Sequence, residues 1–353
     1  MIYLNTASVG LVSEESVKAA QDFQHETLTN PSKAFMRWME KDLVELRNRM
    51  AELVHTQPEN VAFVSNFSFG IISVINCLKT KVKRVLLFKT DYPSLNMPFE
   101  LGGFDISYVE SPDDFAFTFE AIQKIIEHGK IEVVALSHVQ FLTGFTFDFK
   151  QLSEYCREKG IVFILDVTQS IGAFEFDFSE LSCDVLIASS YKWLNGGLGS
   201  GVLLVKPAFI EKFTPTFAGL GSLTMQGNDW SYVPSAKSFE PGHLNPLGLL
   251  QLSKSLENRL QQGVENVQKH NHELVKRLGN ALQNSRFELI GGNDAKHLSN
   301  ICCIKASQEV GNYLTEKEIY VTWRKGALRV SPHFYNNEAD IDAFATALLH
   351  FKN

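Results

Sequence analysis

Short apolar runs alternate with amphipathic stretches from residue 60 to about residue 205. The runs VVAL, VFIL, VLIA and VLLV contain no polar position, as expected of strands that are covered on both faces. Between several of these runs lie stretches with helical spacing, and such alternation is typical of a mostly parallel α/β sheet. The predicted strands lie at residues 60–65, 83–90, 104–110, 131–139, 160–167, 183–190 and 199–206. The predicted helices lie at residues 69–79, 117–129 and 149–160.

The pattern changes after Glu240. A helical stretch extends from about residue 246 to 283, and Gly263 within it predicts a kink or a break between two helices. Short β-rich runs and a last helical stretch follow, which together predict a small α+β unit. These β-rich runs lie at residues 286–290, 300–305, 319–324 and 327–331. No repeat or Pro/Ser-rich linker separates the two parts, so we expect them to pack directly on each other.

Composition and charge narrow the classes of function. The chain has 353 residues, with 33 basic and 40 acidic side chains and a net charge of −7. It has no dense run of Lys or Arg, so nucleic acid and anionic membranes are poor partner candidates. No leader pattern and no apolar stretch of about 18–20 residues is present, and we expect a cytoplasmic protein. The five cysteines show no CxxC spacing and the ten histidines no HExxH, so we expect reduced core thiols and no metal site.

The segment around Lys192 carries the first sign of chemistry. A buried strand ends in two serines and Tyr191, and Lys192 and a glycine-rich turn follow. Because burying an ammonium group is costly, a lysine where a core strand emerges indicates an amine that is condensed with an aldehyde. A surface lysine at a strand end is the alternative interpretation of this segment taken alone.

Asp166 ends another apolar strand, 26 residues before Lys192. In an open parallel sheet, ligands bind beyond the carboxyl ends of the strands, so these two residues can face one site. A carboxylate at that depth needs a cationic partner, and a protonated pyridine nitrogen provides one. An aspartate that caps the following helix is the alternative.

Two motifs carry a resemblance to a known family. D-x-x-Q at residues 166–169, followed by SSYKWLNGG at 189–197, resembles class V pyridoxal-phosphate enzymes: cysteine desulfurases, kynureninases, isopenicillin N epimerase-like proteins and certain aminotransferases. Other segments resemble landmarks of this family in the same order and at suitable spacing. These segments are YLNTASVG, FVSNFSFGIISVIN, TDYPSLNMPF, LSHVQFLTG, FEPGHLN and LRVSPHFYNNEADID.

The resemblance implies a role for each matched residue. Lys192 would hold pyridoxal 5′-phosphate as a Schiff base and later act as the proton-transfer base, and Asp166 would pair with the pyridinium nitrogen. Gln169 would hydrogen-bond the phenolic oxygen, Tyr92 would lie over the ring, and Arg329 would grip the substrate carboxylate through two parallel hydrogen bonds. The implied phosphate contacts are Ser68, the backbone around Phe67, Ser189 and Tyr191. The start of the helix at Ser68 also fits this role physically, because helix N-termini bind anions.

The chain also departs from the family pattern. Phe67 stands where relatives often have Thr, and His243 in FEPGHLN stands where many relatives have a Thr that reaches the neighbouring subunit's phosphate. His243 is either a substitute donor or a surface histidine. No cysteine lies between Tyr320 and Arg329, so a desulfurase would lack its persulfide-forming thiol. YKWLNGG is kynureninase-like, but kynureninases usually show D-x-x-H where this chain has Gln169.

Together, the pattern and the resemblance predict a fold-type I α/β protein with a mostly parallel seven-stranded sheet. We expect a large cofactor-binding domain at about residues 16–245. A smaller α+β domain would comprise residues 1–15 and 246–353. The resemblance also implies a homodimer in which FEPGHLN crosses to the partner's site.

The expected activity is that of an aminotransferase acting on an amino acid. A pyridoxal-phosphate lyase, either kynureninase-like or cysteine/selenocysteine lyase-like, and an epimerase are the alternatives, because all these reactions share the same first steps. A non-catalytic relative is the least favoured reading, since Lys192, Asp166, Gln169 and Arg329 are all present. A dehydrogenase does not fit, because the glycines at 196–201 precede a strand and contain no G-x-G-x-x-G.

Overall fold

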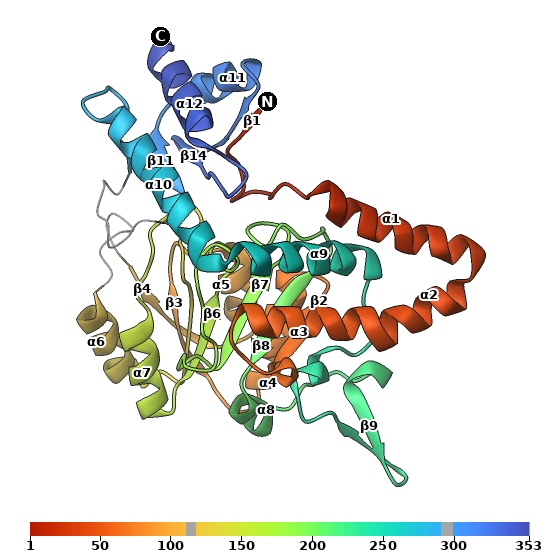
Figure 1. The fold of residues 1–353 in the computed structure, drawn as a ribbon. Helices are drawn as coiled ribbons and strands as arrows, with labels where there is room; N and C mark the ends of the chain where they lie inside the picture. The colour runs from red at the N-terminus through yellow and green to blue at the C-terminus, as the bar shows by residue number, and fades with distance from the viewer. Residues whose placement is uncertain (111–117, 291–298, 353) are drawn as a thin grey trace.

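A computed structural model describes residues 1–110, 118–290 and 299–352 (Figure 1). Its centre is a seven-stranded sheet in the order β2-β8-β7-β6-β5-β3-β4, in which only β8 runs antiparallel to its neighbours. Each of the seven predicted strands contains one of these strands, so the mostly parallel sheet is confirmed. The strands are β2 (Val61–Val64), β3 (Arg84–Phe88), β4 (Asp105–Val109), β5 (Val133–Ser137), β6 (Val162–Asp166), β7 (Val185–Ser189) and β8 (Gly201–Val205).

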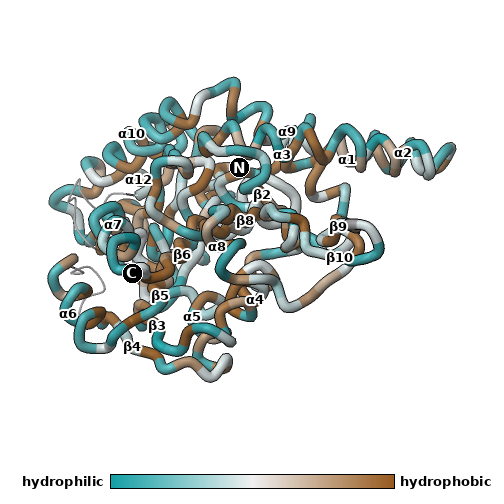
Figure 2. The backbone as a smooth tube through the Cα atoms, turned by 90° about the horizontal axis from the view of Figure 1, so that it is seen from below, coloured by the Kyte–Doolittle hydropathy of each residue, from teal (hydrophilic) through white to brown (hydrophobic). Residues whose placement is uncertain are grey.

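Helices cover both faces of this sheet, which explains the uninterrupted apolar runs. Alternate residues of one strand enter different cores: Leu86 packs into one and Val85 into the other. The first core is closed by α3 (Leu43–Leu53), α6 (Phe119–Gly129), α7 (Lys150–Lys159) and α9 (Pro246–Gln262). The second is closed by α4 (Phe67–Leu78), α5 (Pro93–Glu100) and α8 (Pro207–Lys212). Figure 2 shows the apolar colouring gathered on the central strands.

The C-terminal part of the chain forms a separate core over a small antiparallel sheet of order β11-β14-β13. The chain start joins it, because β1 (Ile2–Tyr3) pairs parallel with β12 (Ile319–Tyr320). The predicted break at Gly263 is confirmed, since α9 ends there and α10 begins at the next residue. The predicted run at 286–290 gives only an isolated bridge from Leu289 to Ile304. The other elements are α10 (Val264–Leu282), β11 (Cys302–Lys305), α11 (Gln308–Glu316), β13 (Thr322–Arg324), β14 (Ala327–Val330) and α12 (Glu338–His350).

An arm of helices, for which the pattern analysis names no element, precedes β2. It consists of α1 (Glu14–Thr29), α2 (Pro31–Arg37), a π-helical turn (Trp38–Asp42) and α3. The Ser13 and Asn30 side chains cap α1 and α2, and α1 packs on α9. The arm projects to the right of Figure 1, above the hairpin of β9 (Leu223–Gln226) and β10 (Asp229–Tyr232). Short 3-10 turns lie at Pro58–Asn60, Leu220–Ser222 and Ala236–Phe239.

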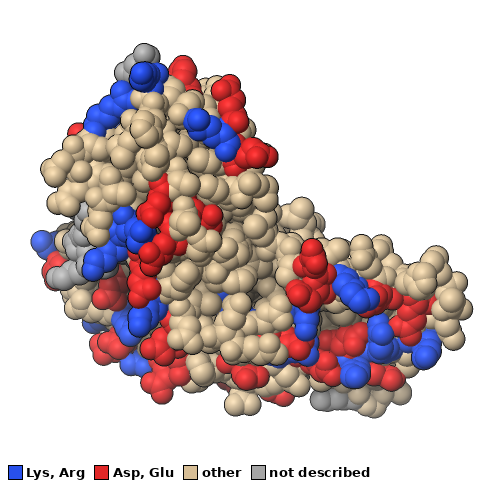
Figure 3. All heavy atoms as spheres, turned by 45° about the horizontal axis from the view of Figure 1, so that its top comes forward, with Lys and Arg blue, Asp and Glu red and all other residues tan. Residues whose placement is uncertain are grey.

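The surface carries both signs of charge. Lys and Arg are interspersed with Asp and Glu along the arm and over the body (Figure 3). Among the helices in the described ranges, none combines the length and the apolar character needed to span a membrane.

Candidate active site

The carboxyl ends of two neighbouring strands bring Asp166 and Lys192 into one site. Asp166 is the last residue of β6, and it pairs with Ile187 on the parallel strand β7. β7 ends at Ser189, three residues before Lys192. Because both strands run in the same direction, their carboxyl ends lie at one edge of the sheet, where open α/β proteins bind ligands.

Burial shifts the titration of both groups. Burial raises the pKa of Asp166, although a hydrogen bond from Thr168 N to its Oδ1 (2.8 Å) and the nearby Lys192 charge act against this. Burial lowers the pKa of Lys192, and the Asp166 charge opposes that shift. The lysine is thus biased towards its neutral amine, which is the form that condenses with a carbonyl group. Neither group has a salt bridge within 4 Å among the described residues.

Gln169 is held by the protein at both ends of its amide. Its Oε1 accepts a hydrogen bond from Trp193 Nε1 at 2.8 Å, and its Nε2 donates to Ala7 O at 3.0 Å. A side-chain amide has two donor hydrogens, so one remains for a further acceptor. This fits the predicted contact with a phenolic oxygen, which stays a prediction.

Aromatic rings surround the lysine amine. Lys192 Nζ lies 5.8 Å from the centre of the Tyr92 ring, and Tyr92 packs edge-to-face with Phe67 at 5.9 Å and with Phe141 at 5.3 Å. The Tyr92 backbone N–H donates to the buried Asp91 carboxylate at 2.7 Å. This arrangement provides the flat apolar surface that a cofactor ring needs. Asp91 is not among the predicted site residues, although its position directly before Tyr92 in TDYPSLN offered a signal.

The start of α4 supplies the predicted anion-binding backbone. Phe67 and Ser68 are its first two residues, and Asn66 caps the helix by accepting from Phe69 N at 3.0 Å. The Phe67 side chain is buried in a core, so only its backbone faces a ligand. Ser189 N donates to Thr168 Oγ1, and Tyr191 hydrogen-bonds Ser189. Contacts of Ser68, Phe67, Ser189 and Tyr191 with a phosphate stay predictions.

Arg329 lies on β14, where its neighbours Leu328 and Val330 are buried in the core of the C-terminal part. Its Nη1 donates to Phe141 O at 2.8 Å and its Nη2 to Ser8 Oγ at 2.6 Å. Burial lowers its pKa to about 10, and it forms no salt bridge with a carboxylate of the described residues. Two of its five donor hydrogens are engaged, and three remain for a ligand. A buried guanidinium without a counter-ion fits an anionic ligand group.

A loop at the chain start completes the site. Ala7 and Ser8 contact the side chains of Gln169 and Arg329, and Gly10 N donates to Tyr191 O at 2.8 Å. A Cβ on Gly10 would lie only 2.1 Å from Lys192 O. Ser8 and Gly10 belong to YLNTASVG, which resembles a family landmark, but neither is among the predicted site residues.

His243 lines a cavity whose wall does not include Lys192. It is exposed on the loop after β10, and its ring packs edge-on against Phe35 at 5.0 Å. Arg47 anchors this loop through two hydrogen bonds to Glu240, at 2.9 and 2.8 Å. A cavity of about 500 Å³ separates the loop from α4, with the exposed Phe69 on its wall. The predicted phosphate contact of His243 in a dimer stays a prediction.

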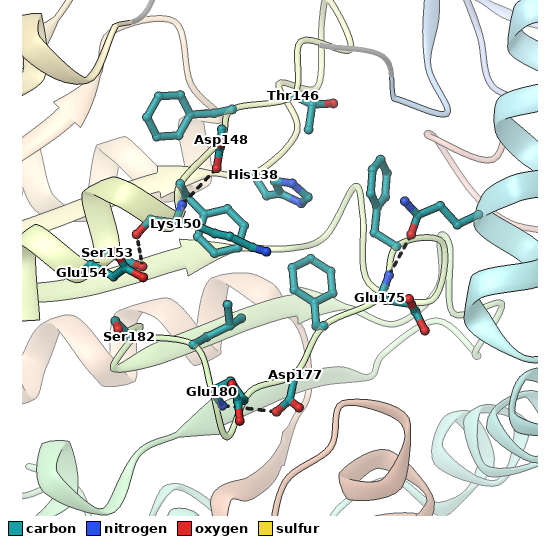
Figure 4. Close-up of a pocket in the computed structure, with 16 residues that line it drawn as sticks. His138, Thr146, Asp148, Lys150, Ser153, Glu154, Glu175, Asp177, Glu180 and Ser182 are labelled. Carbon is teal, nitrogen blue, oxygen red and sulfur yellow. Dashed lines mark hydrogen bonds between the residues drawn. The ribbon is translucent and has the colours of Figure 1, made fainter. Parts of the chain in front are cut away.

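A second cavity, of about 580 Å³, follows the ends of β5 and β6 (Figure 4). His138 lies in its wall, and the backbone N–H of this histidine donates to Asp166 O at 3.0 Å. Burial among aromatic rings lowers the pKa of His138 to about 3. Lys192 and Arg329 do not line this cavity, so it is distinct from the site described above.

Taken together, the site offers a reactive amine, a buried carboxylate without a fixed cation, a spare amide donor, an aromatic face and a helix N-terminus. Each matches one part of pyridoxal 5′-phosphate: its aldehyde, ring nitrogen, phenolic oxygen, ring face and phosphate. The residues present therefore fit the cofactor that the sequence motifs indicated.

Comparisons with known proteins agree with this geometry. A family model described as aminotransferase class-V matches residues 2–344. A probable cysteine desulfurase of Pyrococcus abyssi is 22% identical, with 99% of this chain and 93% of that protein covered. An uncharacterized aminotransferase of Bacillus subtilis is 23% identical, with coverages of 98% and 94%.

Solved structures show the same fold. The cystine C–S lyase C-DES in complex with its product cysteine persulfide superposes with a TM-score of 0.89 at 20% identity, covering 100% of this chain and 98% of that one. A cysteine desulfurase of Thermococcus onnurineus gives a TM-score of 0.87 at 20% identity, with coverages of 98% and 93%. At this identity the structural likeness establishes the architecture alone, and the fold-type I prediction is confirmed.

Proposed function

The chain belongs to the class V aminotransferase family of pyridoxal-phosphate enzymes, and from this premise we propose that it is a lyase acting on an α-amino acid. The observation that carries the proposal is the convergence of Lys192, Asp166 and Arg329 at one edge of the sheet. Chemistry at the Cα of an amino acid requires three groups: an amine, a partner for the ring nitrogen, and a residue that binds the substrate carboxylate.

Each group has a defined task. When bound, the cofactor supplies an aldehyde for the lysine amine and an electron-withdrawing ring that acidifies bonds at the substrate Cα. The Asp166 carboxylate would pair with the ring nitrogen and favour its protonated form, because a buried anion favours a cationic partner. Arg329 fixes the substrate carboxylate and therefore its orientation. Lys192 then takes the proton from Cα, for which an amine of lowered pKa is suited.

The sequence analysis favoured transamination, whereas the comparisons support its alternative, a lyase, better. Relatives named cysteine desulfurase and the fold neighbour named cystine C–S lyase act on C–S bonds according to their names. For a β-substituted alanine, elimination breaks the bond from Cβ to the leaving group. With one water molecule, the products are pyruvate, ammonium and the protonated leaving group. Aminotransferase activity is the second candidate, since a relative of similar coverage carries that name.

The thiols of the chain argue against transfer of sulfur to the enzyme itself. All five cysteines are buried, and none lies between Tyr320 and Arg329. Cys303, which pairs with Arg329 across β11 and β14, donates to Leu142 O, and burial raises its pKa to about 12. A thiolate, and not a thiol, is the nucleophile in such transfers. We therefore infer that the leaving group departs into solvent and not onto a protein cysteine.

A product assay tests the reaction type. The holoenzyme is incubated with single β-substituted alanines, and pyruvate, ammonium and the cofactor spectrum are followed with and without an added keto acid. Continuous pyruvate release without keto acid supports the lyase. Stoichiometric conversion of the cofactor to its amine form, with turnover only after keto acid is added, would instead show an aminotransferase. Treatment with a thiol-alkylating reagent should leave activity unchanged, whereas a thiol-dependent desulfurase would be inactivated.

We also propose that the active form is a homodimer in which the loop carrying His243 reaches the partner's phosphate site. The loop is exposed beside Phe69, which is 64% exposed at the start of α4, and the adjoining cavity leaves room for another chain. Mixing inactive Lys192→Ala and His243→Ala proteins should restore partial activity, because a hybrid dimer holds one intact site. A monomeric, fully active species in sedimentation would contradict this. The expected cytoplasmic location also stays a prediction.

A further inference from the structure

Arg324 lies on the same face of a β-hairpin as Arg329. β13 and β14 pair antiparallel, with Thr322 opposite Arg329 and Arg324 opposite Ala327. Side chains that are opposite in such a pair leave the sheet on one face, and every second residue of a strand shares that face. Arg324 is therefore the diagonal neighbour of Arg329, at a separation of roughly 7–8 Å.

This face of the hairpin is turned towards the active site. Thr322 Oγ1 donates to Asn5 Oδ1 at 2.6 Å and lies 2.9 Å from Ser8 Oγ, which also accepts from Arg329. On the opposite face, Leu328 is fully buried in the core of the C-terminal part. The side chain of Arg324 therefore leaves the hairpin on the same face as Arg329.

The positive charge of Arg324 reaches the reacting groups. Burial lowers the pKa of both Lys192 and Arg329, and the charge of Arg324 lowers each of them further. Arg324 is exposed, and it forms no salt bridge with any carboxylate in the described parts of the chain. Asp166 is the acidic group that opposes these shifts at Lys192. The guanidinium of Arg324 thus adds a positive charge to the site beyond the one that Arg329 offers to the substrate carboxylate.

We propose that Arg324 binds a second anionic group of the substrate, so that the enzyme selects α-amino acids whose side chain ends in a carboxylate, sulfinate or sulfonate. This rests on the proposed function, in which Arg329 holds the α-carboxylate. With the α-carboxylate at Arg329, the diagonal position places a second guanidinium a side chain's length away. A guanidinium offers planar paired donors to either kind of oxyanion. A neutral side chain leaves this charge without a partner and gains nothing from it.

Matched amino-acid pairs test the proposal on the holoenzyme. The two members of each pair differ mainly in the charge of the side chain. The pairs are aspartate and asparagine, glutamate and glutamine, and cysteine sulfinate and S-methylcysteine. Apparent affinity is read from the change in cofactor absorbance, and kcat and KM are measured where turnover occurs. The wild type should bind the anionic member at least about 10-fold more tightly, as a charged hydrogen-bonded contact provides. In Arg324→Gln this preference should fall to near one, and Arg324→Lys should keep part of it.

Lys325→Gln is the matched control, because it removes one positive charge at the tip of the same hairpin and should preserve the preference. An equal loss for both members of each pair in Arg324→Gln, or no preference in the wild type, overturns the proposal. A second measurement does not depend on turnover. Glutarate, which has two carboxylates, should raise the melting temperature of the wild type more than butyrate, which has one, and Arg324→Gln should abolish this difference. If no amino acid changes the cofactor spectrum of any variant, the proposed function fails. The glutarate shift then still decides whether Arg324 binds a second anion.

Discussion

Replacing Arg329 by alanine is the most decisive single change at this site. Arg329 is 3% exposed, and its guanidinium is held by Phe141 O and Ser8 Oγ, with no carboxylate partner among the described residues. Because the guanidinium is already desolvated in the folded protein, binding of a substrate carboxylate to its free donor hydrogens carries no further desolvation cost for the arginine. Loss of the guanidinium should therefore impair both substrate binding and the orientation of the Cα–H bond.

The structure sets the size of this effect. Three donor hydrogens of Arg329 remain after the contacts with Phe141 and Ser8, which is enough for a two-pronged contact. Each charged hydrogen bond contributes about 1.5–3 kcal/mol, so two of them correspond to roughly 10²–10⁴-fold in kcat/KM. Arg329→Lys should recover little of this loss, because an ammonium group cannot reproduce two parallel donors.

Steady-state kinetics on the two Arg329 variants measure the effect, and the cofactor spectrum and thermal unfolding report on folding. Arg277 provides a matched control, because it is an exposed arginine whose salt bridges to Asp342 and Glu338 join α10 to α12. Arg277→Ala should change kcat/KM less than threefold, since exposed pairs contribute only about 0–1 kcal/mol. Near-normal kinetics in a folded, cofactor-loaded Arg329→Ala protein would show that the substrate is held elsewhere or has no α-carboxylate.

Three further changes test separate parts of the site. Asp166→Asn keeps an acceptor for Thr168 N but removes the charge, so kcat/KM should fall at least about 10²-fold, whereas unchanged kinetics would remove Asp166 from the mechanism. Burial lowers the pKa of His138 from its usual 6.5 to about 3, so the stability contributed by the neutral ring is present above pH 6.5 and is lost as the pH falls from 6.5 towards 3. Between pH 6.5 and 5, the free energy of unfolding of the His138→Leu protein, measured in urea, should fall by about 2 kcal/mol less than that of the wild type. The same pH dependence in both proteins would refute the lowered pKa of His138. Gly10→Ala should cost about 1–3 kcal/mol of stability and reduce activity, since its Cβ would overlap Lys192 O; a wild-type melting curve would contradict the close packing of this loop.

The sequence determined the sheet and the position of the reactive lysine. Strands covered on both faces must be apolar at successive positions, so runs such as VFIL and VLIA identify β6 and β7 without any tertiary information. Asp166 follows the first run directly, Lys192 follows the second run after three residues, and parallel strands share one carboxyl edge. The family motifs then indicated the cofactor, because several landmarks occur in one order.

The tertiary structure alone decided which distant segments complete the site. Ser8 and Gly10 reach Arg329 and the lysine turn from the chain start, across more than 180 residues of sequence. The position of Arg324 beside Arg329 follows from the hairpin register, and a shift by one residue would place it on the opposite face. Hydrophobic periodicity records only which face of an element is buried. It carries no record of which other element covers that face, and the packing of the whole chain settles that choice.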